Sequence, residues 1–131
     1  MKILILFLMI FLHIVDDFYL QGVLAKMKQR RWWKENAPLK MYRNDYKAAL
    51  LVHGFSWTFM VMLPLFIYGI TSDKRSTLVL YIIEFFANWY MHVQIDNGKA
   101  NEGVLNLVED QALHLVQIIA VWLITCAAMM I

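Results

Sequence analysis

Cysteine, proline and glycine are all scarce in this chain, whose 131 residues include one cysteine, two prolines and five glycines. Because Cys126 has no second cysteine to pair with, an intrachain disulfide is excluded, and nothing indicates an oxidising compartment. The sequence also lacks internal repeats, low-complexity tracts and the apolar–polar alternation that is typical of strands. These absences favour helices joined by short connections.

Apolar residues, by contrast, are abundant. They make up 61% of the chain, and the mean hydropathy is +0.54. Soluble domains are about 45–50% apolar, and a chain of this length cannot hide so much apolar surface from water. We therefore expect a single domain, residues 1–131, with an all-α fold. The composition predicts a polytopic membrane protein whose four transmembrane helices form a compact bundle in the lipid bilayer.

Four apolar segments are long enough to cross a hydrocarbon core about 30 Å thick at about 1.5 Å per residue. The predicted helices cover about residues 2–26, 45–70, 77–99 and 105–131. Polar turns at residues 71–76 and 97–104 separate the last three. The first run is similar to a signal peptide, but no small-x-small cleavage site follows it, so we expect it to be retained.

Positive charge is concentrated in one segment, because eight of the twelve lysines and arginines lie between Lys26 and Lys47. Beside a membrane helix such a segment is typical of a cytoplasmic loop, and Trp32 and Trp33 within it are typical of the headgroup layer. We expect the 27–45 connection in the cytoplasm and both termini outside, in a bacterial inner membrane. No nucleic-acid partner is expected. Substrate binding by the basic loop is the alternative to anchoring.

All four histidines lie in apolar stretches, and three of them have an aspartate four residues away. Residues four apart share one face of a helix, and an ionisable group in a membrane helix is costly unless it is paired or binds a metal. Counting from the cytoplasmic helix ends places every histidine roughly 8–15 Å below the boundary. The pairs are His13 and Asp17, His92 and Asp96, and Asp110 and His114.

The predicted polar layer combines imidazole nitrogens with carboxylate oxygens, a donor set that suits a divalent zinc, manganese or iron ion. Four histidines and three aspartates exceed the ligands of one tetrahedral zinc, so one or two ions fit. Asp16 is expected to point about 100° away from Asp17. Any one of these residues alone, His53 above all, also fits a hydrogen bond between helices. The predicted metal ligands are His13, Asp17, His53, His92, Asp96, Asp110 and His114.

Other polar residues lie next to this layer. In a catalytic site, Asp17, Asp96 and Asp110 would act as ligands or bases, and Lys99 or Lys26 would hold a phosphate. Both lysines fit equally well as anchors that reach the membrane surface. Gln21 and Gln111 are expected to donate hydrogen bonds to the site. Glu84 extends the polar stripe of Asn88, His92 and Asp96 towards the outer side, where it would be neutral or paired with another helix.

Four motifs, taken in order, resemble those of a bacterial and phage family of small integral membrane proteins of unknown function. The motifs are His13-x3-Asp17-Phe18-x-Leu20-Gln21, Leu50-Leu51-Val52-His53, His92-x3-Asp96-x2-Lys99 and Asp110-Gln111-x2-His114. The resemblance covers nearly the whole chain, although the loop with Trp32 and Trp33 matches no motif. More distantly, the chain is similar to YdjM-type membrane-bound proteins, which implies a metal-dependent hydrolase. Its short length also suits a phage-encoded member.

The sequence leaves three classes of function open. The leading hypothesis is a membrane-embedded, metal-dependent hydrolase with its His/Asp site near the cytoplasmic face. Its substrate would be a small phosphoester or a phosphorylated lipid such as a lipid pyrophosphate. The alternative is a non-enzymatic interaction or regulatory protein, for example in phage exclusion or defence, with a structural metal site. A proton or ion pathway is the third, and oligomerisation is left open.

Overall fold

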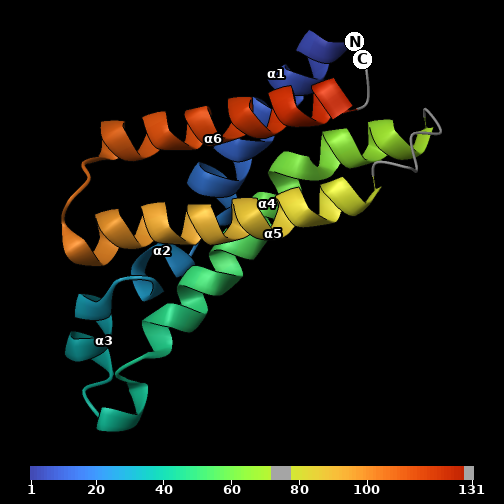
Figure 1. Ribbon diagram of the computed structural model, residues 1–131. Helices are drawn as coiled ribbons and strands as arrows, with labels where there is room; N and C mark the ends of the chain where they lie inside the picture. The colour runs from blue at the N-terminus through green and yellow to red at the C-terminus, as the bar shows by residue number, and fades with distance from the viewer. Residues whose placement is uncertain (72–77, 129–131) are drawn as a thin grey trace.

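The computed structural model describes residues 1–71 and 78–128 (Figure 1). In these residues every regular element is helical, so the expected all-α fold is confirmed. The elements are α1 (Lys2–Ile14), the π-helix η1 (Val15–Leu20), α2 (Leu24–Met27), α3 (Arg30–Asn36), the 3-10 helix η2 (Lys40–Tyr42), α4 (Asp45–Thr71), α5 (Leu78–Asn97), the π-helix η4 (Gly98–Glu102) and α6 (Leu107–Ala128). The predicted turn after Thr71 and the predicted end of the last helix at residue 131 lie outside the described residues.

Four segments are long and apolar enough to cross a membrane: Lys2–Leu20, Lys40–Thr71, Leu78–Glu102 and Leu107–Ala128. Each long helix packs on two neighbours, α4 on α1 and α5, and α6 on α1 and α5. The start of α1 and the end of α6 lie at one end of the bundle, where Trp122 Nε1 donates a hydrogen bond to the Lys2 carbonyl over 3.1 Å (Figure 1). α2, α3 and η4 lie at the opposite end.

The interior of the bundle is apolar at one end and polar at the other. An apolar cluster joins α1, α4 and α6 in the half that contains the start of α1. Large apolar side chains such as Phe7, Ile83 and Val116 are instead exposed on the outside. Extensive exposed apolar surface is unusual for a water-soluble monomer, and this arrangement fits helices surrounded by lipid. The cluster consists of Ile5, Met9, Trp57, Val61, Met62, Leu65, Ile118 and Val121.

The first predicted helix, residues 2–26, is not continuous in the structure. The α-helix ends at Ile14, widens into η1, and is interrupted before the single turn of α2. Gly22 has φ of +51°, in the left-handed region that glycine adopts without the steric cost of a Cβ. The interruption lets α2 turn back and pack against α4, which brings the following residues over the polar end of the bundle.

The connections at the polar end contain helical elements where the sequence predicted loops and turns. The basic connection contains α3 and η2, and Trp33 Nε1 donates to the Met27 carbonyl over 2.6 Å. After η4, Gly103 with φ of +67° ends the third span. Asn106 then caps α6, because its Oδ1 accepts from the backbone N–H groups of Val108 and Glu109, while Glu109 Oε2 accepts from the Asn106 N–H.

Candidate metal centre

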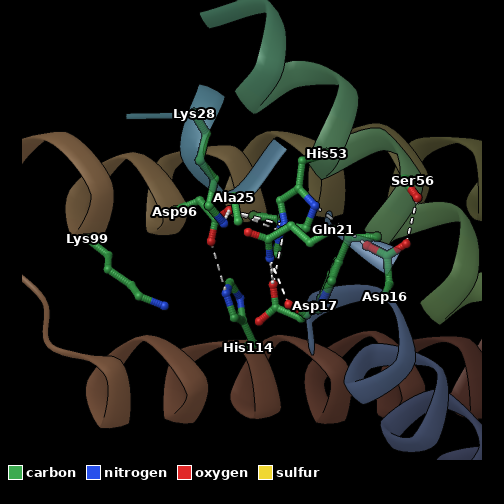
Figure 2. A network of polar contacts seen from close by, with 12 residues as sticks. Asp16, Asp17, Gln21, Ala25, Lys28, His53, Ser56, Asp96, Lys99 and His114 are labelled. Carbon is green, nitrogen blue, oxygen red and sulfur yellow. Dashed lines mark hydrogen bonds and ion pairs between the residues drawn. The ribbon is translucent and has the colours of Figure 1, made fainter. Parts of the chain in front are cut away.

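The polar end of the bundle contains a buried layer of histidines and aspartates supplied by all four long helices (Figure 2). The i, i+4 spacing places His92 and Asp96 on the inner face of α5, and Asp110 and His114 on the inner face of α6. His53 points inward from α4, and η1 supplies Asp17. The common depth predicted for these residues therefore corresponds to direct proximity in the structure.

Asp96 lies at the centre of the layer. Its Oδ2 is 3.3 Å from His53 Nε2 and 3.8 Å from His92 Nε2, and its Oδ1 is 3.4 Å from His114 Nε2. The second carboxylate that faces this region is Asp17, whose Oδ1 is 3.3 Å from His53 Nε2. One aspartate thus presents its two oxygens to histidines on different helices.

The donor atoms form two groups, each with all its ligand atoms within 4.8 Å of one another. The first group is His53, His92 and Asp96, and the second is Asp17, Asp110 and His114. His114 Nε2 lies 3.5 Å from Asp110 Oδ1 within the second group. Seven predicted residues were expected in one site, and the structure brings six of them into these two adjoining groups.

The separations between donor atoms fit a metal site better than a set of direct hydrogen bonds. Four of the histidine–aspartate distances are 3.3 to 3.5 Å, and two more are 3.7 and 3.8 Å. All are longer than the roughly 2.7–3.2 Å of an N–H···O hydrogen bond. Two atoms bound at about 2.0–2.1 Å to one tetrahedral ion lie about 3.4 Å apart. The four shorter separations are therefore close to those between ligands of an ion, and two of them, His53–Asp17 and His114–Asp96, join the two groups.

Several of these buried atoms have no hydrogen-bond partner within residues 1–71 and 78–128. They include both ring nitrogens of His92 and His114, Nε2 of His53, and Oδ1 of Asp96 and Asp110. A buried polar atom without a partner is costly, and most such atoms in native proteins are satisfied. A divalent cation bound by one ring nitrogen of each histidine and by the carboxylate oxygens would satisfy most of these atoms together, so the residues present fit a metal.

His13 belongs to neither group. Its Nδ1 accepts a hydrogen bond from Trp57 Nε1 over 2.7 Å, so Nε2 carries the hydrogen and donates to Gln111 Oε1 over 3.1 Å. Gln111 Nε2 in turn donates to Asp17 Oδ2 and Asp110 Oδ2 over 2.7 and 3.1 Å. With both ring nitrogens engaged, His13 orients Gln111, and Gln111 holds the two carboxylates in place. Gln21 also donates to Asp17, as expected.

Asp16 was expected to point away from the layer, and the structure contradicts that expectation. Its side chain is buried, its Oδ1 accepts a hydrogen bond from Ser56 Oγ over 2.6 Å, and its Oδ2 faces His53 Nδ1 at 3.7 Å. The 100° rotation between successive residues holds for an α-helix, whereas Asp16 and Asp17 lie in the wider π-helix η1. A carboxylate that accepts a hydrogen bond from a histidine ring commonly orients a metal ligand, but at 3.7 Å Asp16 lies beyond hydrogen-bond distance of His53.

Two lysines border the layer, and only one of them was expected. Lys99 Nζ donates to Asp110 Oδ2 over 2.6 Å. Lys26, the expected alternative, is exposed, whereas Lys28 is buried and its Nζ donates to Asp96 Oδ2 over 2.7 Å. The interruption at Gly22 directs Lys28 inward, and no periodicity in the sequence signals that turn.

Trp57 forms the boundary between the polar layer and the apolar cluster. Its ring stacks on the His92 ring, with the centroids 4.0 Å apart and the planes at 14°. Trp57 lies four residues after His53 on α4, and this spacing in the sequence could have predicted that both side chains face the layer. Beyond this boundary the stripe of α5 continues, because Gln117 Nε2 donates to Asn88 Oδ1 over 2.5 Å and Thr125 Oγ1 donates to Glu84 Oε2 over 2.6 Å.

A cavity of about 380 Å³ leads to the layer. Its polar lining includes Asp17, Gln21, Lys28, Lys99 and Gln111, which all contact each other or the buried aspartates. A molecule in this cavity would therefore touch the side chains that hold the candidate metal ligands. The cavity gives the buried layer a route to the outside of the protein.

A helical bundle with an apolar exterior, four candidate membrane spans and an interior His/Asp layer defines a membrane-embedded protein with a candidate metal centre. The chain belongs to the family described as "Protein of unknown function (DUF3307)", whose model matches residues 4–130. The expected membership of an uncharacterised family is thereby confirmed. No curated protein and no solved structure matches the chain.

Proposed function

We propose that this protein is a membrane-embedded, metal-dependent hydrolase of phosphoesters. The observation that carries the proposal is the position of two His/Asp groups beside a cavity that also contains two lysine ammonium groups. Nitrogen and oxygen donors favour zinc, manganese or iron, and paired ammonium groups favour an anionic substrate. Two groups give room for one or two ions.

The charges of the layer support a bound cation. If the imidazoles are neutral, as metal ligands must be, and all four carboxylates are ionised, then Asp16, Asp17, Asp96 and Asp110 carry two more negative charges than Lys28 and Lys99 neutralise. Uncompensated charge in a poorly solvated interior is strongly unfavourable. One divalent ion balances this difference, and a second leaves the site positive, as suits an anionic phosphoester.

Each side chain has a distinct task in the proposed reaction. A bound divalent ion would make its water acidic enough to act as a nucleophile near neutral pH. Five members of the two groups would hold the ions: His53, His92, His114, Asp96 and Asp110. Of the three aspartates of these groups, Asp17 is the one that lines the cavity, so it accepts the proton of the attacking water. Lys28 and Lys99 hold the phosphate oxygens.

We further propose that the end with α2, α3 and η4 faces the cytoplasm of a bacterial cell, with the chain in the inner membrane. The lysines and arginines concentrated between Lys26 and Lys47 support this orientation. Both termini then lie outside. The substrate reaches the cavity from the cytoplasm or from the cytoplasmic leaflet.

A second candidate function is a non-enzymatic membrane protein in which the layer is structural and serves binding or regulation of another membrane protein. The ion pairs Lys28–Asp96 and Lys99–Asp110 favour it, because they compensate two of the buried carboxylates without a metal. The coordination of the metal distinguishes the two functions. A structural site is closed by protein ligands, whereas a catalytic site keeps an open position for water or substrate.

Metal content and turnover, measured together, test the proposal. The purified protein should contain a divalent metal by elemental analysis and should hydrolyse members of a panel of phosphoesters and lipid pyrophosphates. Asp96→Asn and Asp110→Asn keep the side-chain volume, and each should reduce turnover by about 100-fold or more while the protein stays in the membrane. Glu35→Gln, in an exposed carboxylate of α3, is the matched control. Full turnover in both Asn variants would contradict the hydrolase.

A further inference from the structure

The cavity that leads to the candidate metal centre has one apolar side. Phe18 of η1 and Leu107 at the start of α6 line it, and they are 57% and 55% exposed. Both residues belong to segments that are apolar and long enough to cross a membrane. In a membrane their exposed surfaces would face lipid, and the cavity would then lie between the lipid and the His/Asp layer.

Further apolar side chains on η1 and α6 are exposed beside this opening. On η1, Tyr19 and Leu20 are 77% and 59% exposed, and on α6 Val108 is 76% exposed. The two charged residues of η1, Asp16 and Asp17, both engage partners inside the bundle. A small charged molecule would gain nothing from this rim, whereas the hydrocarbon chain of an amphiphile would stay in contact with apolar surface.

Two lysines give the lining of the same cavity positive charge. Lys28 approaches from the connection between α2 and α3, and Lys99 approaches from η4 (Figure 2). An ammonium group has three N–H donors, and each lysine uses one of them on an aspartate of the layer. Donors therefore remain on both lysines for the oxygens of a phosphate. A volume of about 380 Å³ accommodates a headgroup, at the lower end of the usual range for ligand sites.

We infer that the substrate is a lipid phosphate monoester of the leaflet that borders this end of the bundle. Its phosphate lies between Lys28 and Lys99, and its hydrocarbon chain leaves the cavity between Phe18 and Leu107. This inference rests on the proposed hydrolase function and specifies the substrate of that site. Water attacks phosphorus, the ester P–O bond breaks, and the proton taken up by Asp17 passes to the lipid alkoxide, which yields a lipid alcohol and inorganic phosphate.

The test measures binding separately from hydrolysis, with the full chain in detergent or nanodiscs. The probes are phosphatidic acid, the water-soluble glycerol 3-phosphate with the same phosphate monoester, and phosphatidylcholine, a lipid without one. Native mass spectrometry gives binding, and phosphate release gives turnover. Phosphatidic acid should bind at least about tenfold more tightly than either other probe, because it uses both the lysines and the apolar side of the cavity.

Three variants assign that binding to the cavity. Lys99→Gln keeps a hydrogen-bond donor for Asp110 but removes the charge, and it should weaken phosphatidic acid binding by about tenfold. The exposed Lys26→Gln is its control. Leu107→Trp narrows the opening and should weaken binding comparably, whereas Val116→Trp, on the exposed face of the same helix, should not.

The outcomes separate the lipid substrate from the hydrolase itself. Equal binding and turnover of glycerol 3-phosphate, unchanged by Leu107→Trp, would overturn the lipid substrate and leave a phosphoester hydrolase. Selective binding of phosphatidic acid that depends on Lys99 and Leu107, without release of phosphate from any probe, would support the lipid site and overturn the hydrolase. Binding of phosphatidylcholine as tight as that of phosphatidic acid would contradict recognition of the phosphate monoester.

Discussion

Lys28 Nζ lies 2.7 Å from Asp96 Oδ2, although 68 positions separate the two residues in the sequence. This buried ion pair joins the short segment after Gly22 to the centre of the His/Asp layer on α5. It fixes the basic connection against the bundle, and its lysine lines the cavity. The contribution of this pair to the stability of the protein can be measured without an assay of activity.

Replacement of Lys28 by alanine should destabilise the protein, because it leaves the carboxylate of Asp96 buried with one partner fewer. The loss of one member of a buried ion pair costs about 3–5 kcal/mol. Thermal unfolding in detergent should show a clear decrease in Tm, and the decrease should be larger in chelator than with metal, which compensates part of the charge. Lys26→Ala, two residues earlier on an exposed side chain, should leave Tm unchanged.

Chelation should lower the Tm of the purified protein, because a ligand that binds only the folded state stabilises it by about 2.7 kcal/mol at 100 times its Kd. His92→Ala removes a ligand from the first group alone and should decrease the bound metal by one equivalent in a protein with two ions. Elemental analysis and melting curves check both points. If a preparation that contains metal melts at the same temperature with and without chelator, the bound metal does not stabilise the folded protein, and the prediction is contradicted.

Glu84→Gln should leave metal content and hydrolysis close to those of the wild type. Glu84 lies on the side of Asn88 away from the layer, and Thr125 Oγ1 can donate to a glutamine oxygen as it does to the carboxylate. Turnover tests the hydrolase, and pH-driven proton uptake in proteoliposomes tests a proton pathway. Proton uptake by the wild type that the variant abolishes would favour a proton pathway through the stripe on α5.

Gly22→Ala should weaken the structure of the polar end. At φ of +51° an alanine Cβ costs about 1–2 kcal/mol, although the nearest atom to that Cβ, the Leu20 carbonyl oxygen, is 3.7 Å away. The chain relieves this strain by continuing the helix, which moves Lys28 away from Asp96. Limited proteolysis of the 27–45 connection should become faster than in the wild type. Unchanged proteolysis and Tm would show that the interruption does not depend on glycine.

The orientation in the membrane can be tested on intact cells. A cysteine at Glu35, exposed on α3, in a background with the buried Cys126 replaced by serine, should resist an impermeant thiol reagent until the cells are opened. Labelling of the same cysteine after permeabilisation is the internal control. Labelling from outside would show that the protein has the opposite orientation, with the cavity at the outer leaflet.

The long helices and the proximity of His53, His92 and His114 could be predicted because both follow from regular periodicity. A span of known length and a fixed rise per residue give the depth of each side chain. Asp16 and Lys28 could not be placed in this way. Their positions depend on a π-helical turn and on one left-handed glycine, and each of these changes the direction of the following side chain without changing the hydropathy pattern.

His13 was predicted to be a metal ligand, but it lies outside both groups for a different reason. Its spacing from Asp17 is the same as that of His92 from Asp96, yet Trp57 and Gln111 occupy its two nitrogens. Those partners come from α4 and α6. Only the packing of three helices decides which histidine presents a free nitrogen to the layer, so a shared motif did not determine a shared role.

The position of the charged layer towards one end of the bundle has a consequence for how the protein enters the membrane. Within residues 1–71 and 78–128, the lysines that pair with these aspartates come from other segments, Lys28 to Asp96 and Lys99 to Asp110, so the pairs form only in the assembled structure. A charged side chain is most costly at the centre of a membrane helix, where it costs about 2.5–3.5 kcal/mol. Each helix can therefore insert separately with its carboxylate near the headgroups, and the layer loses its water only when the four helices associate.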